Sequence, residues 1–72
     1  MEPRGLQETF LNALRKSGTP TTFFLVNGFQ MKGVVKAYDQ YTLILESGGQ
    51  QKLVFKHALS TLIPDTVIEW QC

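Results

Sequence analysis

Lys56 and His57, the chain's only histidine, form the pair of side chains best suited to hold an anionic or heteroaromatic ligand. They directly follow the apolar residues 53–55, so we expect them where a strand ends. An ammonium group there can meet a phosphate or a carbonyl oxygen, and an imidazole can hydrogen-bond to a base or stack on it. Taken alone the pair is weak, because a surface lysine beside an incidental histidine is the more frequent explanation.

Aromatic side chains near predicted turns are the second candidate binding feature. Tyr38 and Tyr41 bracket a turn that contains Gln40, while Phe24 and Phe29 lie close to an earlier turn. An aromatic residue on a half-buried sheet usually belongs to the core, yet at a strand end it can stack on a splayed base for about 1–3 kcal/mol. We therefore expect at least one of the two tyrosines to be exposed, with the Gln40 amide offering a donor and an acceptor to a base edge.

The sequence gives little support to a catalytic site or a metal site. His57 has no carboxylates at ligand spacing around it, and Ser60 and Asp65 are not accompanied by a G-x-S-x-G motif. The loop at residues 47–49 leads into a strand and not into a helix N-terminus, as a phosphate loop would. The sequence therefore predicts a binding protein that is not an enzyme, with no cofactor, no metal and no small-molecule substrate.

The size of the chain points to self-association. A domain of 72 residues buries only about 60% of the surface that its unfolded chain exposes. Cys72 is the only cysteine, which excludes an internal disulfide and a four-cysteine zinc site. Association with further copies is the remaining way to supplement so small a core.

Net charge is only +1, but its distribution is uneven. Residues 1–64 carry seven Lys and Arg against four Asp and Glu, and the other two acidic residues lie in the end segment. No apolar run approaches the ~18 residues of a membrane span, and the first residues lack the profile of a secretory signal. We expect a cytoplasmic protein without a membrane partner.

One amphipathic helix and five short strands must position these side chains. Over residues 6–16, Leu6, Phe10 and Leu14 form an apolar stripe that is expected to pack on a sheet. Strand-like segments follow at residues 21–26, 30–38, 41–46, 51–55 and 58–63. The dipeptide at residues 27–28, Asn-Gly, favours a type I′ hairpin, and Gly33 permits a sharp bend that lets the sheet curl on itself.

The fourth and fifth strands predict a ring. Both are short, hydrophobic segments with no proline inside them and little to protect an exposed edge. We infer from this strand chemistry that these edges pair with neighbouring copies and that the pairing closes on itself instead of growing into a fibre.

The whole arrangement resembles the Hfq family, the bacterial Sm-like RNA chaperones. The motifs that carry the resemblance lie between residues 6 and 64, in the family's order and at nearly its spacing: Leu6-Gln7, Phe10-Leu11-Asn12-Ala13-Leu14-Arg15-Lys16, Leu25-Val26-Asn27-Gly28, Gly33, Asp39-Gln40, Phe55-Lys56-His57-Ala58, Ser60-Thr61 and Pro64. The resemblance implies a mostly β Sm-like RNA-binding domain at residues 6–64, with a flexible N-terminus at 1–5 and a short C-terminal segment at 65–72. It also implies a helix-capped, strongly bent five-stranded antiparallel sheet (an SH3-like small barrel) and a homohexameric ring in which the fourth strand of one subunit pairs with the fifth of the next.

The resemblance further assigns three surfaces. The proximal set, on the helix-bearing face, would bind U-rich RNA through Gln7, Gln40, Tyr41, Lys56 and His57. The distal set, on the opposite face, would bind A-rich RNA through Phe24, Gly28, Phe29, Gln30, Met31, Lys32, Lys52 and Thr61. A basic rim beside the helix is matched by Asn12, Arg15, Lys16 and Tyr38. The uncharged pair at residues 17–18 follows the rim cations, where strong-rim members carry further charge, so we expect a weak rim.

The implied function is an RNA chaperone that brings small regulatory RNAs and messenger RNAs together in post-transcriptional regulation and the stress response. Two alternatives remain. One is a small SH3-like barrel whose aromatic residues grip a Pro-rich peptide of a protein partner, and the other is an Sm-like ring with a purely scaffolding role.

Overall fold

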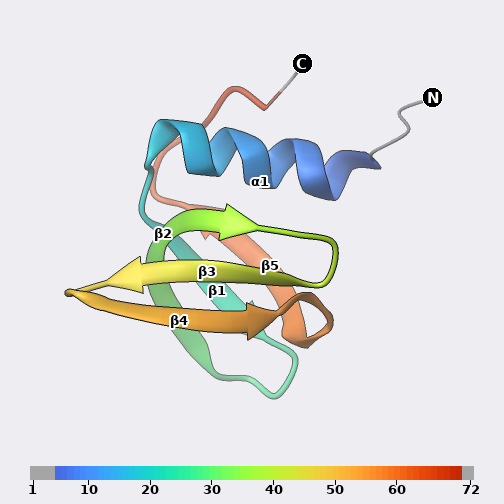
Figure 1. Ribbon diagram of the computed structural model, residues 1–72, viewed down its shortest axis with the longest axis vertical. Coiled ribbons are helices and arrows are strands. Elements are labelled where there is room, and N and C mark those ends of the chain that lie inside the picture. The colour runs from blue at the N-terminus through green and yellow to red at the C-terminus, as the bar shows by residue number, and fades with distance from the viewer. Residues whose placement is uncertain (1–4, 71–72) are drawn as a thin grey trace.

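The computed structural model describes residues 5–70 and contains one helix followed by five antiparallel strands (Figure 1). The elements are α1 (Gly5–Ser17), β1 (Thr21–Leu25), β2 (Gln30–Tyr38), β3 (Thr42–Ser47), β4 (Gln50–Phe55), a 3-10 turn (Lys56–Ala58) and β5 (Leu59–Pro64). The strands form one sheet in the order β4-β3-β2-β1-β5. This confirms the predicted architecture. The expected flexible segment 1–5 lies outside the described residues apart from Gly5, which begins α1.

The helix packs on the sheet through a face slightly rotated from the predicted one. Leu11 and Leu14 are buried and Phe10 packs partly against the core. Leu6 does not join them, since 64% of its surface is exposed, and the prediction that it completes the apolar stripe is wrong. Leu6 instead lines an open groove between α1 and β5, together with Phe10 and Leu59. At the other end of the helix, the Gly18 N–H donates to the Leu14 carbonyl at 3.0 Å.

Gly33 is the point at which β2 changes partners. Residues 30–33 of β2 pair with β1, whereas residues from Val34 onward pair with β3. A Cβ on Gly33 would lie only 2.9 Å from the Glu46 carbonyl oxygen, so any side chain would force the two strands apart. The bend expected at this glycine is therefore confirmed, and it lets one sheet curl around the core (Figure 1).

The loop between β1 and β2 is not a type I′ turn. That turn requires positive φ at both central residues, but in this loop only Gly28 has it, at 94°. The Gly28 N–H donates to the Leu25 carbonyl at 2.9 Å, and the Leu25 N–H donates to the Phe29 carbonyl at 2.8 Å. This is a three-residue hairpin loop that ends in a left-handed glycine. The Asn27 carboxamide oxygen accepts from the Phe29 N–H at 3.0 Å, which uses the asparagine as a side-chain acceptor and not as a left-handed residue.

A two-residue loop with positive φ at both central positions occurs instead between β3 and β4. Ser47 and Gln50 face each other there, and Gly48 and Gly49 have φ of 57° and 83°. The predicted hairpin at this position is therefore confirmed.

The core lies between the helix and the concave side of the sheet. The two strands predicted to be bare, β4 and β5, are the edges of the sheet. The buried apolar residues are Leu11, Leu14, Phe23, Val35, Leu43, Leu45 and Val54. On the edge strands, Leu53, Phe55 and Ile63 keep 57%, 54% and 51% of their surface exposed. In the part of the chain that the structure describes, β4 and β5 each pair with a single strand, so both edges are open.

The C-terminal segment, residues 65–70, folds back along the helix (Figure 1). Ile68 packs against the core, and the Asp65 N–H donates to the Pro20 carbonyl at 2.9 Å. Cys72 lies outside the described residues. Among residues 5–70, no helix is long and apolar enough to cross a membrane.

Candidate functional site

The turn between β2 and β3 is organised by one carboxylate oxygen. Asp39 Oδ1 accepts from the Tyr41 N–H at 2.9 Å, from the Thr42 N–H at 2.8 Å and from the Thr42 hydroxyl at 2.9 Å. The Asp39 N–H donates to the Thr42 carbonyl at 2.9 Å and closes the turn. The backbone N–H donors of Tyr41 and Thr42, followed by the Thr42 hydroxyl, lower the pKa of Asp39 because they stabilise its charged form.

This turn presents Tyr41 to solvent. Its ring is 69% exposed, as expected for at least one of the tyrosines, and the neighbouring Gln40 is exposed as well. The Tyr41 carbonyl accepts from the Lys56 N–H at 2.8 Å. The turn and the segment after β4 are therefore joined through the backbone at Tyr41, whose side chain is free to stack on a ligand.

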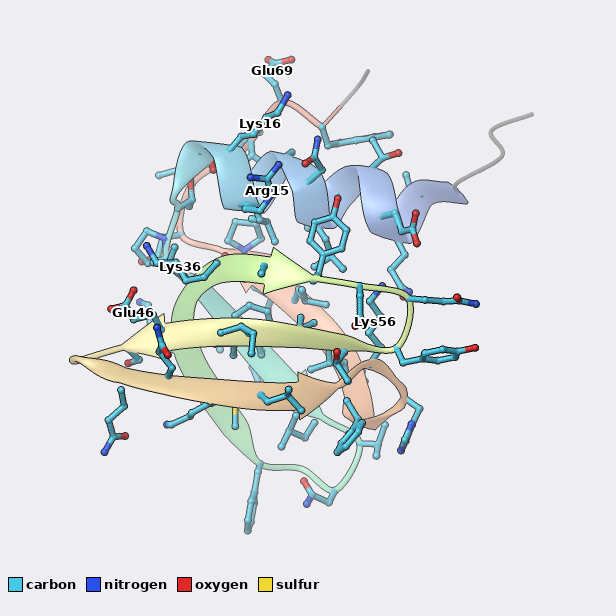
Figure 2. The ribbon with its side chains drawn as sticks, in the orientation of Figure 1. Arg15, Lys16, Lys36, Glu46, Lys56 and Glu69 are labelled. Carbon is cyan, nitrogen blue, oxygen red and sulfur yellow. The ribbon has the colours of Figure 1, made fainter. Side chains whose placement is uncertain are left out.

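Lys56 is held between this turn and the helix. Its Nζ lies 5.5 Å from the centre of the half-buried Tyr38 ring, within the range of a cation–π contact. The Tyr38 hydroxyl donates to the Glu8 carbonyl of α1 at 3.4 Å. Gln7, one residue earlier, lines the same groove as Lys56, between α1 and β5. Figure 2 places Lys56 beside the β2–β3 turn.

His57 completes this surface at the end of β4. It is exposed, and its ring stacks on that of Phe55 at a centroid distance of 5.8 Å and an interplanar angle of 21°. In the protomer, Gln7 and Lys56 line one groove, and the Lys56 N–H donates to the Tyr41 carbonyl. Gln40 is next in the turn and His57 is next in the chain. All five residues of the predicted proximal set come from three segments that meet at one end of the sheet.

The predicted distal set rests on strand register. Thr61, Phe24 and Gln30 lie opposite one another across β5, β1 and β2. Lys32 is two residues from Gln30, so these four side chains share the face that points away from the core. Gly28 and Phe29 extend this face into the β1–β2 loop, where the Phe29 ring is 70% exposed.

Two members of the distal set are placed elsewhere. Met31 lies opposite Phe23 and packs partly against the core, on the other face of β2. Because side chains alternate between the two faces of a strand, Met31 points to the opposite face from its neighbours Gln30 and Lys32. Lys52 is on β4, the sheet edge opposite to β5, so within one protomer it does not join Thr61.

Lys32 is not a free cation. Its Nζ lies 3.0 Å from Asp65 Oδ2, and both side chains are about half exposed. The acidic end segment therefore already neutralises one of the cations assigned to the distal face.

Only three of the four predicted rim residues, all on α1, lie together. Asn12 accepts a hydrogen bond from Arg15 at 2.8 Å, and Arg15 and Lys16 are exposed at the C-terminal end of α1 (Figure 2). The Tyr38 ring contacts Lys56 of the proximal set. Tyr38 therefore belongs to the proximal surface at least as much as to the rim.

The sequence reasoning treated Asp39 only as a turn residue and missed its role as the acceptor that fixes Tyr41. An aspartate at the start of a turn, followed two and three residues later by backbone donors, is the signature of an Asx-turn and could have indicated it. Chemically, the site offers stacking, amide hydrogen bonding and a cation, which suits it to binding an unpaired nucleotide.

Comparisons with known proteins agree with the fold and the motifs. The chain matches the family model described as "Hfq protein" over residues 6–69. It is 59% identical over 59 residues to the RNA-binding protein Hfq of Desulforudis audaxviator, covering 82% of this chain and 71% of that protein. It is 48% identical over 69 residues to the RNA-binding protein Hfq of Bacillus subtilis, covering 96% and 94%.

A solved structure supports the same assignment. The crystal structure of a pleiotropic translational regulator, Hfq, superposes with a TM-score of 0.79 at 44% identity, covering 82% of this chain and 98% of that one. Helix, bent sheet and the motif order from Leu6 to Pro64 thus coincide with a family match over most of the sequence, and the chain belongs to the Hfq family.

Proposed function

We propose that this chain is a cytoplasmic RNA chaperone that assembles into a homohexameric ring, binds U-rich and A-rich single-stranded RNA on opposite faces, and promotes pairing of small regulatory RNAs with messenger RNAs. Family membership supports the proposal, as do relatives named RNA-binding proteins. No catalytic step is part of it.

The observation that carries the proposal is that the sheet has two open edges and that the proximal side chains lie beside one of them, β4. β4 and β5 are the edges of the sheet, and β4 exposes apolar side chains that an isolated subunit leaves in water. If β4 of one subunit pairs with β5 of the next, the sheet continues from copy to copy and buries these side chains. Lys56 and His57 directly follow β4, so the same closure repeats them around the ring.

Ring symmetry also multiplies a small charge. Residues 1–64 carry three more cations than anions, and six copies concentrate this excess on one assembly. Since binding releases counterions, affinity for a single strand should fall with salt by roughly 0.7 log units per log unit of salt for each neutralised phosphate.

On the proximal face, the Tyr41 ring stacks on uracil, Lys56 contacts a uracil carbonyl oxygen, and His57 approaches the phosphate or terminal ribose. Gln7 and Gln40 supply amide hydrogen bonds to base edges. On the distal face, Phe24 and Phe29 supply the stacking surfaces, and the backbone at Gly28 lets an adenine approach closely. Gln30, Lys32 and Thr61 add polar contacts. Lys52 reaches this surface only from a neighbouring subunit, and Met31 acts from beneath it.

Fluorescence anisotropy with labelled oligo-U and oligo-A tests the proposal. Wild-type protein should bind both at moderate salt with dissociation constants below micromolar, and an excess of one unlabelled oligomer should leave the other bound. Failure of both oligomers to bind would contradict RNA binding and favour a barrel that grips a Pro-rich peptide. Ring assembly without RNA binding would favour the scaffolding alternative.

A further inference from the structure

The backbone of Tyr41 is held by Asp39, a residue that lies outside the predicted binding set. Tyr41 is an exposed ring on a tight turn, and an unrestrained exposed aromatic must lose conformational freedom when it stacks on a ligand. Here its backbone is held on both sides: the N–H donates to Asp39 Oδ1 at 2.9 Å, and the carbonyl accepts from the Lys56 N–H at 2.8 Å.

We propose that Asp39 is a positioning residue for nucleotide binding, which holds the Tyr41 platform in the geometry that a uracil base meets. This inference rests on the proposed function and deepens its proximal surface. Asp39 acts through Tyr41 and does not itself touch the base.

Three hydrogen bonds converging on one carboxylate oxygen make the restraint strong for an exposed group. The donors are the backbone N–H groups of Tyr41 and Thr42 and the Thr42 hydroxyl, at 2.8–2.9 Å. Hydrogen bonds to an ionised acceptor are roughly twice as strong as neutral ones. The lowered pKa of Asp39 has these donors as its main cause, which agrees with a carboxylate that stays charged throughout the physiological range.

Lys56 is positioned by contacts with the two tyrosines. Its N–H donates to the Tyr41 carbonyl at 2.8 Å. Tyr38 supports that position from below, with its ring 5.5 Å from Nζ. As an anion on the same turn, Asp39 opposes the approach of phosphate. Pre-organisation should outweigh that repulsion because it reduces the ordering cost of every binding event.

The test is oligo-U affinity, with oligo-A as the internal reference, in three variants. Asp39→Ala removes the acceptor and should weaken oligo-U binding about tenfold while oligo-A binding stays unchanged. Asp39→Asn retains an acceptor oxygen without the charge and should restore affinity to within about threefold of wild type. Glu46→Gln, which removes an equal charge from a carboxylate ion-paired with Lys36 at 3.3 Å, should change neither affinity.

A double-mutant cycle shows whether Asp39 acts through the platform. In a Tyr41→Ala background, Asp39→Ala should have little further effect on oligo-U binding, whereas independent roles would give additive losses. Additive losses, or Asp39→Ala binding oligo-U as tightly as wild type or tighter, would overturn the inference.

The remaining outcomes are also decisive. If Asp39→Ala weakens oligo-A and oligo-U binding equally, the variant has lost its assembly. Thr42→Val then tests the inference, because this variant removes one hydrogen-bond donor to Asp39 and leaves the carboxylate in place. It should weaken oligo-U binding about twofold, and unchanged affinity would overturn the inference. Wild-type protein that fails to bind oligo-U would instead contradict the proposed function.

Discussion

The two faces assigned to RNA are built in different ways. The proximal surface gathers side chains from the start of α1, the β2–β3 turn and the segment after β4. Asp39 Oδ1 accepts from the Tyr41 N–H within the turn, and the Lys56 N–H donates to the Tyr41 carbonyl. The distal surface is a row of side chains fixed by register across three strands. A surface built on register is disturbed by whatever moves the sheet. A surface built on a turn can be disturbed locally without unfolding the domain.

Both surfaces depend on the bend of β2 at Gly33, where the strand changes partners. Replacing Gly33 should therefore have the largest effect on stability and on binding. Gly33→Val places a Cβ about 2.9 Å from the Glu46 carbonyl oxygen and should cost about 1–3 kcal/mol of unfolding free energy or more. Chemical denaturation measures this loss, and binding of both oligomers should weaken together. Gly49→Ala is the control, because it strains only a left-handed turn position (φ 83°) with open space around it. Unchanged stability in Gly33→Val would show that the bend tolerates a side chain.

A matched pair of exposed rings separates the faces. Tyr41 and Phe29 are 69% and 70% exposed, and each lies at a turn. Since stacking contributes about 1–3 kcal/mol per base, Tyr41→Ala should weaken oligo-U binding about 10- to 100-fold and leave oligo-A unaffected. Phe29→Ala should do the reverse. Anisotropy titrations measure both, and thermal unfolding should shift little. Equal losses of both oligomers in either variant would mean that the faces are not independent.

The ion pair on the distal side predicts a gain of binding. Asp65→Asn releases Lys32 from its 3.0 Å partner and should tighten oligo-A binding about two- to threefold, with a steeper salt dependence, because surface ion pairs are worth up to about 1 kcal/mol. Oligo-U binding should not change. Glu46→Gln frees Lys36 in the same way but outside both surfaces, and it should have no effect. Weaker oligo-A binding in Asp65→Asn would contradict a role for Lys32 in RNA contact.

The smallest expected effect is on acid stability. The folded pKa of Asp39 lies below the unfolded value of 3.8, so its contribution to stability is present above that value and is lost as the pH falls through the folded pKa. Asp39→Asn should therefore show a shallower loss of stability than wild type below pH 3.8, measured by denaturation at a series of pH values. Parallel curves would mean that the turn does not stabilise the ionised form.

Much of the fold could be predicted because local and global signals agree. The helix period, the glycine loop at residues 47–49 and the bend glycine predicted one helix and a bent antiparallel sheet, and the two strands predicted to be bare are the edges of that sheet. The first hairpin could not be predicted in detail. The same Asn-Gly dipeptide that favours a type I′ turn also suits a longer loop in which Asn27 accepts a hydrogen bond, and strand register decides between them.

The site was harder to predict than the fold. The resemblance grouped residues by surface, but burial and face depend on strand register that no motif encodes. Met31 alternates into the core between two outward residues, and Leu6 stays exposed in the groove between α1 and β5. The Asp65 partner of Lys32 lies on a segment whose path follows from Ile68 packing against the core, a long-range contact invisible in local sequence.

Native mass spectrometry with and without a short uridine strand tests most directly the claim that open edges close into a ring and create the binding surface. A hexamer that takes up one oligo-U strand per ring is the predicted result. A monomer at micromolar concentration, or a monomer that binds oligo-U as tightly as any assembly, would contradict it.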